Sequence, residues 1–299
     1  MANVHENGKQ GCAIINESLT FEKAEESANY IKSIRNNSPK IAIICGSGCG
    51  VIADLIQNQT VISFSDIPNF PIPTGVPGHK GALILGNIHE KEVVCMQGRY
   101  HAYEGYSTAS CTFPVRVLKQ LGVEIFFNTA ACGALNPNYH EGDIMLLIDH
   151  ISLPALNMDS PLIGKNDKRF GERFLPMVCT YDRQLQDIVC KVFEDIKATD
   201  KFRKGVYINI GGPAFETVAE VIMLRNFGAD AVGMSMTHEN TVAKHCGMRI
   251  VGIGIIADMA PDNYQLTTHT SEQAVIECVK KSGELLKHVV DNFVKIVEI

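Results

Sequence analysis

Short apolar runs alternate with amphipathic stretches along the chain from residue 41 onward. The apolar runs lie at 41–45, 61–64, 82–86, 93–97, 124–128, 143–149, 206–210, 230–234 and 249–257. The amphipathic stretches lie at about 22–36, 107–121, 180–198, 216–227, 238–246 and 271–297. Because the runs are apolar throughout, rather than at every second position, both faces of these strands should be buried. The pattern therefore predicts an α/β fold with a mixed, largely parallel central sheet flanked by helices.

A single domain is expected over residues 21–299, because no linker or internal repeat divides this stretch. Residues 1–20 are expected to form a loosely held arm. Two weakly periodic segments, 65–79 and 153–177, are expected to be long loops, which in compact domains are usually functional.

Composition narrows the class of protein. A chain of 299 residues with 45% hydrophobic and 20% charged residues can bury a sizeable core. The net charge of −6 and the lack of a long Lys/Arg run argue against a nucleic acid partner. We expect a cytoplasmic protein that does not enter a membrane, because the chain shows neither a secretory signal nor an apolar run of membrane-spanning length. The ten cysteines form no C-x-x-C pair and are expected to be reduced thiols.

A glycine-rich turn follows the first apolar run. In GSGCG, starting at Gly46, backbone N–H groups and the Ser47 hydroxyl could bind an anion. An NAD-dependent oxidoreductase is an alternative, because Asp66 lies twenty residues after Gly46. However, the third glycine of a dinucleotide motif would fall on Val51.

Polar residues also follow three later apolar runs. GRYHAYEGY (98–106) concentrates Arg99, His101 and Tyr103, and ligands of open α/β sheets bind at such strand ends. NTAACGAL (128–135) is a run of small residues that would let backbone amides approach an anion. GGPAFETVAE (211–220) offers Phe215 to stack on a flat ring and Glu216 to accept hydrogen bonds from it.

A metal site is not expected in HENTVAKH (238–245). The zinc-binding pattern H-E-x-x-H would need histidine where this chain has Val242. A surface or core role for His238 and His245 is the better interpretation.

Taken in order, eight motifs resemble the trimeric, low-molecular-mass purine nucleoside phosphorylases. They are CGSGCG, VPGH, QGRYHAYEGY, TAACGALN, DIMLLIDHISLP, NDKRFGERF, GGPAFETVAE and GADAVGMSM. The resemblance extends from about residue 21 to the C-terminus, in that family's order and spacing.

The resemblance implies phosphate-dependent cleavage of the N-glycosidic bond of nucleosides, giving a free base and pentose 1-phosphate. Inorganic phosphate would be a co-substrate, no metal or organic cofactor would be needed, and the protein would form a homotrimer. The implied phosphate-binding residues are Ser47, His79, Arg99, His101, Ala131 (through its amide) and Ser235. The implied ribose contacts are Tyr103 and Met234, and the implied base contacts are Phe215, Glu216 and Asp258. His101, Glu216 and Asp258 would be the catalytic groups, and Phe170 would close the pocket of a neighbouring subunit.

Three positions depart from the family's pattern. Cys132 enters the phosphate loop, and Asp258 stands where the family has asparagine. Glu272 stands where the family has a histidine that contacts the ribose 5′-hydroxyl, and His269 is a possible substitute. Because of Asp258, we expect a preference shifted toward bases with an amino group, adenine first and cytosine second. A nucleoside-binding protein with vestigial catalysis is the alternative, and phosphate-dependent release of base would distinguish the two.

Overall fold

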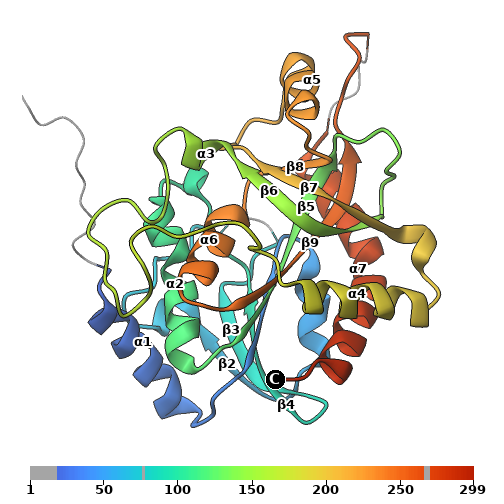
Figure 1. The fold of residues 1–299 in the computed structure, drawn as a ribbon. Helices are drawn as coiled ribbons and strands as arrows, with labels where there is room; N and C mark the ends of the chain where they lie inside the picture. Colours follow the sequence, from blue (N-terminus) through green and yellow to red (C-terminus); the bar gives the residue numbers. More distant parts are fainter. Residues whose placement is uncertain (1–18, 76–77, 266–269) are drawn as a thin grey trace, which may run out of the picture.

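The computed structural model describes residues 19–75, 78–265 and 270–299, and these build a nine-stranded sheet with helices on both faces (Figure 1). The helices are α1 (Phe21–Ile34), α2 (Thr108–Leu121), α3 (Leu153–Leu156), α4 (Arg183–Asp195), α5 (Val218–Asn226), α6 (Thr237–His245) and α7 (Glu272–Ile296). The strands are β1 (Ile41–Cys45), β2 (Gln57–Ser63), β3 (Ala82–Ile88), β4 (Lys91–Gln97), β5 (Ile125–Ala134), β6 (Ile144–Ser152), β7 (Phe202–Asn209), β8 (Ala231–Gly233) and β9 (Arg249–Met259). Four 3₁₀ helices are η1 (Cys49–Leu55), η2 (Phe64–Asp66), η3 (Ala102–Glu104) and η4 (Thr199–Lys201).

The strands run in the order β2-β3-β4-β1-β5-β8-β7-β6-β9, and β9 also pairs with β5. One half of the sheet is therefore open, while β5, β8, β7, β6 and β9 close into a cycle. Parallel pairs join β1 to β4 and β5, β5 to β9, and β7 to β6 and β8; the other four pairs are antiparallel. The predicted mixed sheet is confirmed.

Both faces of the sheet are covered, which explains the continuously apolar runs. Along β1, Ala42 and Ile44 face one core with α1, α2 and α6, whereas Ile41, Ile43 and Cys45 face a second core with η1, α4 and α7. A run that alternated with polar residues would have exposed one of these faces to water.

The NAD-binding interpretation is wrong. The segment after Gly48 forms the 3₁₀ helix η1 rather than the α-helix that a dinucleotide motif requires. The next strand, β2, lies at the edge of the sheet and pairs with β3, not with β1. The expected strand–helix–strand unit is therefore not formed.

Two further differences affect the site. The expected loop at 128–135 is the second half of β5, which continues to Ala134. The helix expected from residue 216 begins at Val218, so Glu216 lies in the loop before α5. The arm expected at residues 1–20 falls almost wholly outside the described residues and stays a prediction. None of the helices described is both long and apolar enough to cross a bilayer.

Candidate active site

A pocket lies where β5 changes its partner. β5 pairs with β1 as far as Asn128 and with β8 from Gly133 onward. Between these positions, among the described residues, no strand pairs with this edge of β5. The pocket is lined by residues from this gap and by the ends or following turns of β1, β4, β7, β8 and β9. Its lining includes Ser47, Arg99, His101, Tyr103, Ala130, Ala131, Cys132, Gly133, Phe215, Glu216, Val232, Gly233, Met234, Ser235, Asp258 and Val275.

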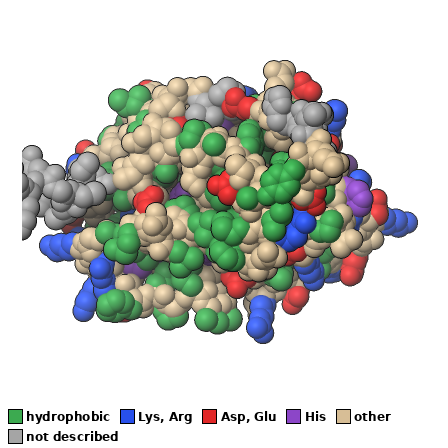
Figure 2. Space-filling model, turned by 90° about the horizontal axis from the view of Figure 1, so that it is seen from above, with side chains coloured by type: hydrophobic (Ala, Val, Ile, Leu, Met, Phe, Trp, Pro, Cys, Tyr) green, Lys and Arg blue, Asp and Glu red, His purple; other side chains and the backbone are tan. Residues whose placement is uncertain are grey.

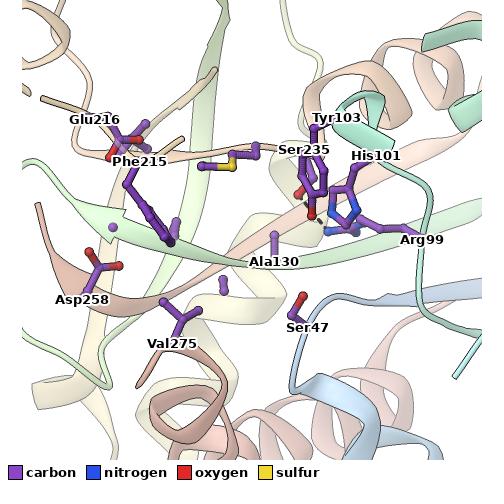
Figure 3. Close-up of a pocket in the computed structure, with 16 residues that line it drawn as sticks. Ser47, Arg99, His101, Tyr103, Ala130, Phe215, Glu216, Ser235, Asp258 and Val275 are labelled. Atoms are coloured by element: carbon purple, nitrogen blue, oxygen red, sulfur yellow. Dashed lines mark hydrogen bonds between the residues drawn. The ribbon is translucent and has the colours of Figure 1, made fainter. Parts of the chain in front are cut away.

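The lining has two polar ends with an apolar middle. Figure 3 shows Ser47, Arg99, His101 and Ser235 at one end and Glu216 and Asp258 at the other, with Phe215 and Val275 between them. Every predicted site residue except His79 and Phe170 lines this pocket. The structure therefore brings the residues chosen from the sequence together in a single site.

His79 supports the first end from behind. Its Nε2 lies 3.1 Å from Ser47 Oγ, its Nδ1 lies 3.1 Å from the Arg99 carbonyl oxygen, and its ring stacks on His101 at 5.1 Å between centroids. Burial, with smaller contributions from His101 and Arg99, lowers the pKa of His79 to about 3. His79 is therefore neutral at physiological pH, so it fixes Ser47 by hydrogen bonding rather than attracting an anion by charge.

Arg99 is buried beside the gap in β5. Its Nη1 donates to Ser235 Oγ at 3.1 Å, its Nη2 donates to Asn128 Oδ1 at 2.5 Å, and its Nε donates to Glu239 Oε1 at 3.2 Å. Nη2 also lies 3.1 Å from Glu239 Oε2, and the Arg99 and Glu239 side chains are only 1% and 2% exposed. The guanidinium is thus held by a fully buried carboxylate.

His101 is oriented by Glu104, three residues later. Glu104 Oε1 lies 3.0 Å from His101 Nδ1 and accepts from the His101 backbone N–H at 2.8 Å. Burial raises the pKa of Glu104, but hydrogen bonds from His101 and Thr74 outweigh this effect and keep that pKa below its usual value. An ionised Glu104 fixes the His101 ring, which stacks on Tyr103 at 4.6 Å.

Two carboxyl groups form the other end. Asp258 Oδ2 accepts from Thr270 Oγ1 at 2.8 Å, and Gly133, which has no side chain, leaves space in front of the Asp258 oxygens. Burial raises the pKa of Asp258, and burial together with the charge of Asp258 raises the pKa of Glu216. Both carboxyl groups therefore retain a proton more readily than they would in water.

The departures from the family pattern have different outcomes. The Cys132 Sγ lies 3.4 Å from the carbonyl oxygen of Ile255, and burial raises the pKa of its thiol, so this cysteine lines the pocket as an apolar group. Glu272 lies close enough to Tyr103 to contribute, after burial and Glu104, to raising the Tyr103 pKa to about 12. His269 lies outside the described residues.

Phe170, the residue expected to close the pocket of a neighbouring subunit, is buried within the single chain. Its ring is only 8% exposed in the single chain, where it packs against Phe21 at 5.0 Å and under the guanidinium of Arg116 at 4.4 Å. Within the single chain Phe170 therefore joins its loop to α1 and α2, and its role at a neighbour's pocket stays a prediction.

The sequence reasoning missed Glu239 and Asn128. HENTVAKH was tested only for zinc binding, and NTAACGAL only for its small residues. The available signal was the position of Glu239 in the first turn of this helix, on the same face as Val242 and Ala243, because a carboxylate buried there needs a cationic partner. Within the part of the chain that is described, no group of three or more His, Cys, Asp or Glu side chains is arranged to hold a metal ion.

Comparison with known proteins agrees with this geometry. A family model described as the phosphorylase superfamily matches residues 40–295. Purine nucleoside phosphorylase of Bos taurus is 42% identical over 271 residues, which are 91% of this chain and 93% of that protein. Purine nucleoside phosphorylase 1 of Bacillus subtilis is 43% identical over 91% of this chain and 99% of its own length.

Solved structures show the same fold. Schistosoma mansoni purine nucleoside phosphorylase in complex with adenosine superposes with a TM-score of 0.90 at 35% identity, over 94% of this chain and 99% of that one. Isoform 2 from the same organism, in complex with cytosine and ribose-1-phosphate, gives a TM-score of 0.90 at 36% identity over 94% and 98% of the two chains. The chain described here therefore belongs to the phosphorylase superfamily, and its activity is that of a purine nucleoside phosphorylase.

Proposed function

We propose that the pocket binds inorganic phosphate at the Arg99 end and a nucleoside base at the Glu216 end, and transfers the pentose from the base to the phosphate. The observation that carries this proposal is the separation of hydrogen-bond donors from carboxyl groups across an apolar middle. Ser47, Arg99, His101, Ser235 and the Ala131 amide would hold the phosphate. The complex of the related isoform 2 with cytosine and ribose-1-phosphate supports this arrangement.

The proposed reaction depends on the charges that develop on the sugar and on the base as the bond between them breaks. As the bond between sugar and base lengthens, the sugar becomes cationic and the base anionic. A phosphate held beside Tyr103 and Met234, the ribose contacts, stabilises the sugar cation and then bonds to the anomeric carbon. A protonated Glu216 stabilises the departing base by donating a hydrogen bond to it. Neither a metal nor a side-chain nucleophile enters these steps.

Asp258 sets the choice of base in this proposal. We place the one proton of the pair on Glu216, so Asp258, which accepts from Thr270, is ionised. An ionised carboxylate accepts from an exocyclic amine but repels the lone pairs of a 6-oxo group. The ring nitrogen N1 of adenine is an acceptor, so it needs a donor, and the raised pKa of Glu216 supports a proton at that position. We therefore expect adenosine first, and cytidine second, to be used better than in a chain with asparagine at position 258.

The Asp258→Asn variant tests this preference. The ratio of kcat/KM for inosine to that for adenosine should rise about 5- to 150-fold, the effect expected for about 1–3 kcal/mol of mismatched hydrogen bonding. Asp262→Asn is the matched control, because Asp262 is exposed and pairs with Arg225 instead. An unmodified protein that already prefers inosine strongly, with a ratio that Asp258→Asn leaves unchanged, would refute the preference.

Chromatography of inosine, guanosine, adenosine and cytidine after incubation, with and without phosphate, tests the reaction itself. We expect base to appear only when phosphate is present. Tight nucleoside binding without any release of base would instead indicate the vestigial binding protein.

A cytoplasmic location is part of this proposal, because the cysteines in the described part of the chain are all free thiols.

The homotrimer also stays a proposal, and an exposed apolar surface supports it. The segment from α3 to residue 178 exposes five large apolar side chains: Leu156, Met158, Ile163, Phe174 and Val178. Phe174 is 88% and Met158 is 82% exposed, and apolar groups so exposed favour burial against another copy. Seen from above, further hydrophobic side chains lie on the face that carries α5 (Figure 2). Sedimentation should give a trimer that Phe174→Glu dissociates, and a fully active monomer would contradict it.

A further inference from the structure

A buried chain of hydrogen bonds leads away from the phosphate end of the pocket. Asn128 Nδ2 donates to Glu239 Oε2 and to Asn240 Oδ1, both at 2.9 Å. Asn240 Nδ2 donates to the hydroxyl of Tyr181 at 3.1 Å, and that hydroxyl lies 3.0 Å from Nδ1 of His150. Asn128, Glu239 and Asn240 are at most 2% exposed, so each donor depends on its protein partner.

This series of hydrogen bonds fixes how the Asn128 amide and the Glu239 carboxylate are oriented beside Arg99. A guanidinium has five N–H groups. Hydrogen bonds to Glu239, Asn128 and Ser235 engage three of them, and Nη2 also lies 3.1 Å from Glu239 Oε2 as an ion pair. Nη1 makes one hydrogen bond, to Ser235, so it keeps a second N–H, and Arg99 lines the pocket. The Asn128 amide must turn its oxygen to Arg99, because its nitrogen already donates to Glu239 and Asn240.

We propose that Glu239 and Asn128 are positioning residues for phosphate: together they aim the free N–H of Arg99 and set the phosphate affinity of the site without touching the nucleoside. Neither residue lines the pocket, so each acts through Arg99. Glu239 also balances the charge of Arg99, which leaves the phosphate to be held by oriented donors more than by net positive charge. This inference rests on the proposed binding of phosphate at Arg99.

The arrangement can be tested by exchanging an acid and an amide of the same shape. In Glu239→Gln, the new amide nitrogen must face a donor, either of Arg99 or of Asn128. In Asn128→Asp, the new carboxylate oxygen must face Glu239 Oε2 across the 2.9 Å contact, so two acceptors meet. Each single substitution therefore breaks the pattern around the guanidinium.

The double substitution Glu239→Gln with Asn128→Asp restores the match of donors and acceptors between positions 128 and 239. The carboxylate at position 128 then accepts from Arg99 and from the new amide at position 239. Asn240 can turn its amide to donate to position 128 and accept from Tyr181. The net charge and the three hydrogen bonds of Arg99 are restored, and the carboxylate that pairs with Nη2 moves from position 239 to position 128.

We expect each single variant to raise the KM for phosphate about 10-fold or more, the loss typical of a misoriented charge-assisted hydrogen bond. The KM for the nucleoside should stay within about 2-fold, and the double variant should return the phosphate KM to within about 3-fold of the unmodified protein. Asp182→Asn is the matched control, because it removes the carboxylate that pairs with Arg249 outside the pocket lining. It should leave both KM values unchanged.

The inference is overturned if the single variants leave the phosphate KM unchanged, or if both KM values rise together as in a general loss of structure. It is also overturned if the double variant is no better than the single ones. If a single variant does not fold, the double variant alone decides: a phosphate KM raised about 10-fold there contradicts the inference, since all hydrogen bonds are restored. Base release that does not need phosphate in the unmodified protein would refute the proposed function instead.

Discussion

Burial decides what each titratable side chain in the pocket contributes. His79 is neutral because its pKa is lowered to about 3, and Glu216 holds a proton more readily because its pKa is raised. Arg99 is charged but paired with Glu239. The site therefore combines one paired charge with several oriented neutral donors. This combination suits phosphate, which in the proposed reaction binds as an anion, bonds to the pentose and leaves as the ester pentose 1-phosphate.

The buried pair makes Arg99 important for stability as well as for binding. Arg99→Met would leave the Glu239 carboxylate buried without its partner, which costs about 3–5 kcal/mol in comparable cases. Arg249→Met removes a partner from the more exposed Asp182 and should cost about 1 kcal/mol or less. Urea unfolding of the two variants measures the difference. Equal losses would contradict the account of Arg99 as the counter-ion of a buried carboxylate.

At the scale of elements, the turn between β1 and η1 lies close against β5. A Cβ on Gly46 would lie 2.9 Å from the Thr129 carbonyl oxygen and 3.3 Å from Nη1 of Arg99. Glycine at this position therefore lets the Ser47 turn lie against the open edge of β5. Gly50, the second residue of η1, has no comparably close neighbour, since Gln97 Nε2 is 3.5 Å from its Cβ position.

These two glycines give a matched pair of variants. Gly46→Ala should push the turn away from β5, lower the free energy of unfolding by about 1–3 kcal/mol and raise the phosphate KM. Gly50→Ala should change neither quantity substantially. Thermal unfolding and phosphate titration of the initial rate check both. Similar behaviour of the two variants would mean that the approach at Gly46 does not shape the site.

The periodic elements of this fold could be predicted from sequence, and the connections that build the pocket could not. The run at 41–45 is apolar because helices cover both faces of β1, and this local pattern was sufficient. The extension of β5 to Ala134 depends on pairing with β9, a strand more than a hundred residues later. Likewise, the packing of Phe170 within the chain could not be predicted, because its partners Phe21 and Arg116 are distant in sequence.

At the scale of the whole molecule, buried histidines make stability depend on pH. Neither ring nitrogen of His238 has a hydrogen-bond partner within the described residues, and burial lowers its pKa from 6.5 to about 4. Between these values the unfolded chain binds a proton that the folded chain does not, so stability falls as the pH falls from 6.5 toward 4. The lowered pKa of His79 acts in the same direction.

Replacing His238 by leucine should remove this dependence. Without phosphate, the stability lost between about pH 7.5 and about pH 5 should be smaller by about 2 kcal/mol in His238→Leu than in the unmodified protein. His288→Leu is the control, because His288 is exposed on α7. The comparison uses urea unfolding at the two pH values. The same acid loss in His238→Leu and in the unmodified protein would contradict a buried, neutral His238.

The central claim is that phosphate receives the pentose in the pocket between Arg99 and Glu216. The most direct measurement incubates the unmodified protein with adenosine, phosphate and a metal chelator, and quantifies free base, pentose 1-phosphate and free pentose. The account predicts one pentose 1-phosphate for each base released, no free pentose, and no reaction when phosphate is left out. Release of base together with free pentose, or activity that the chelator abolishes, would contradict it.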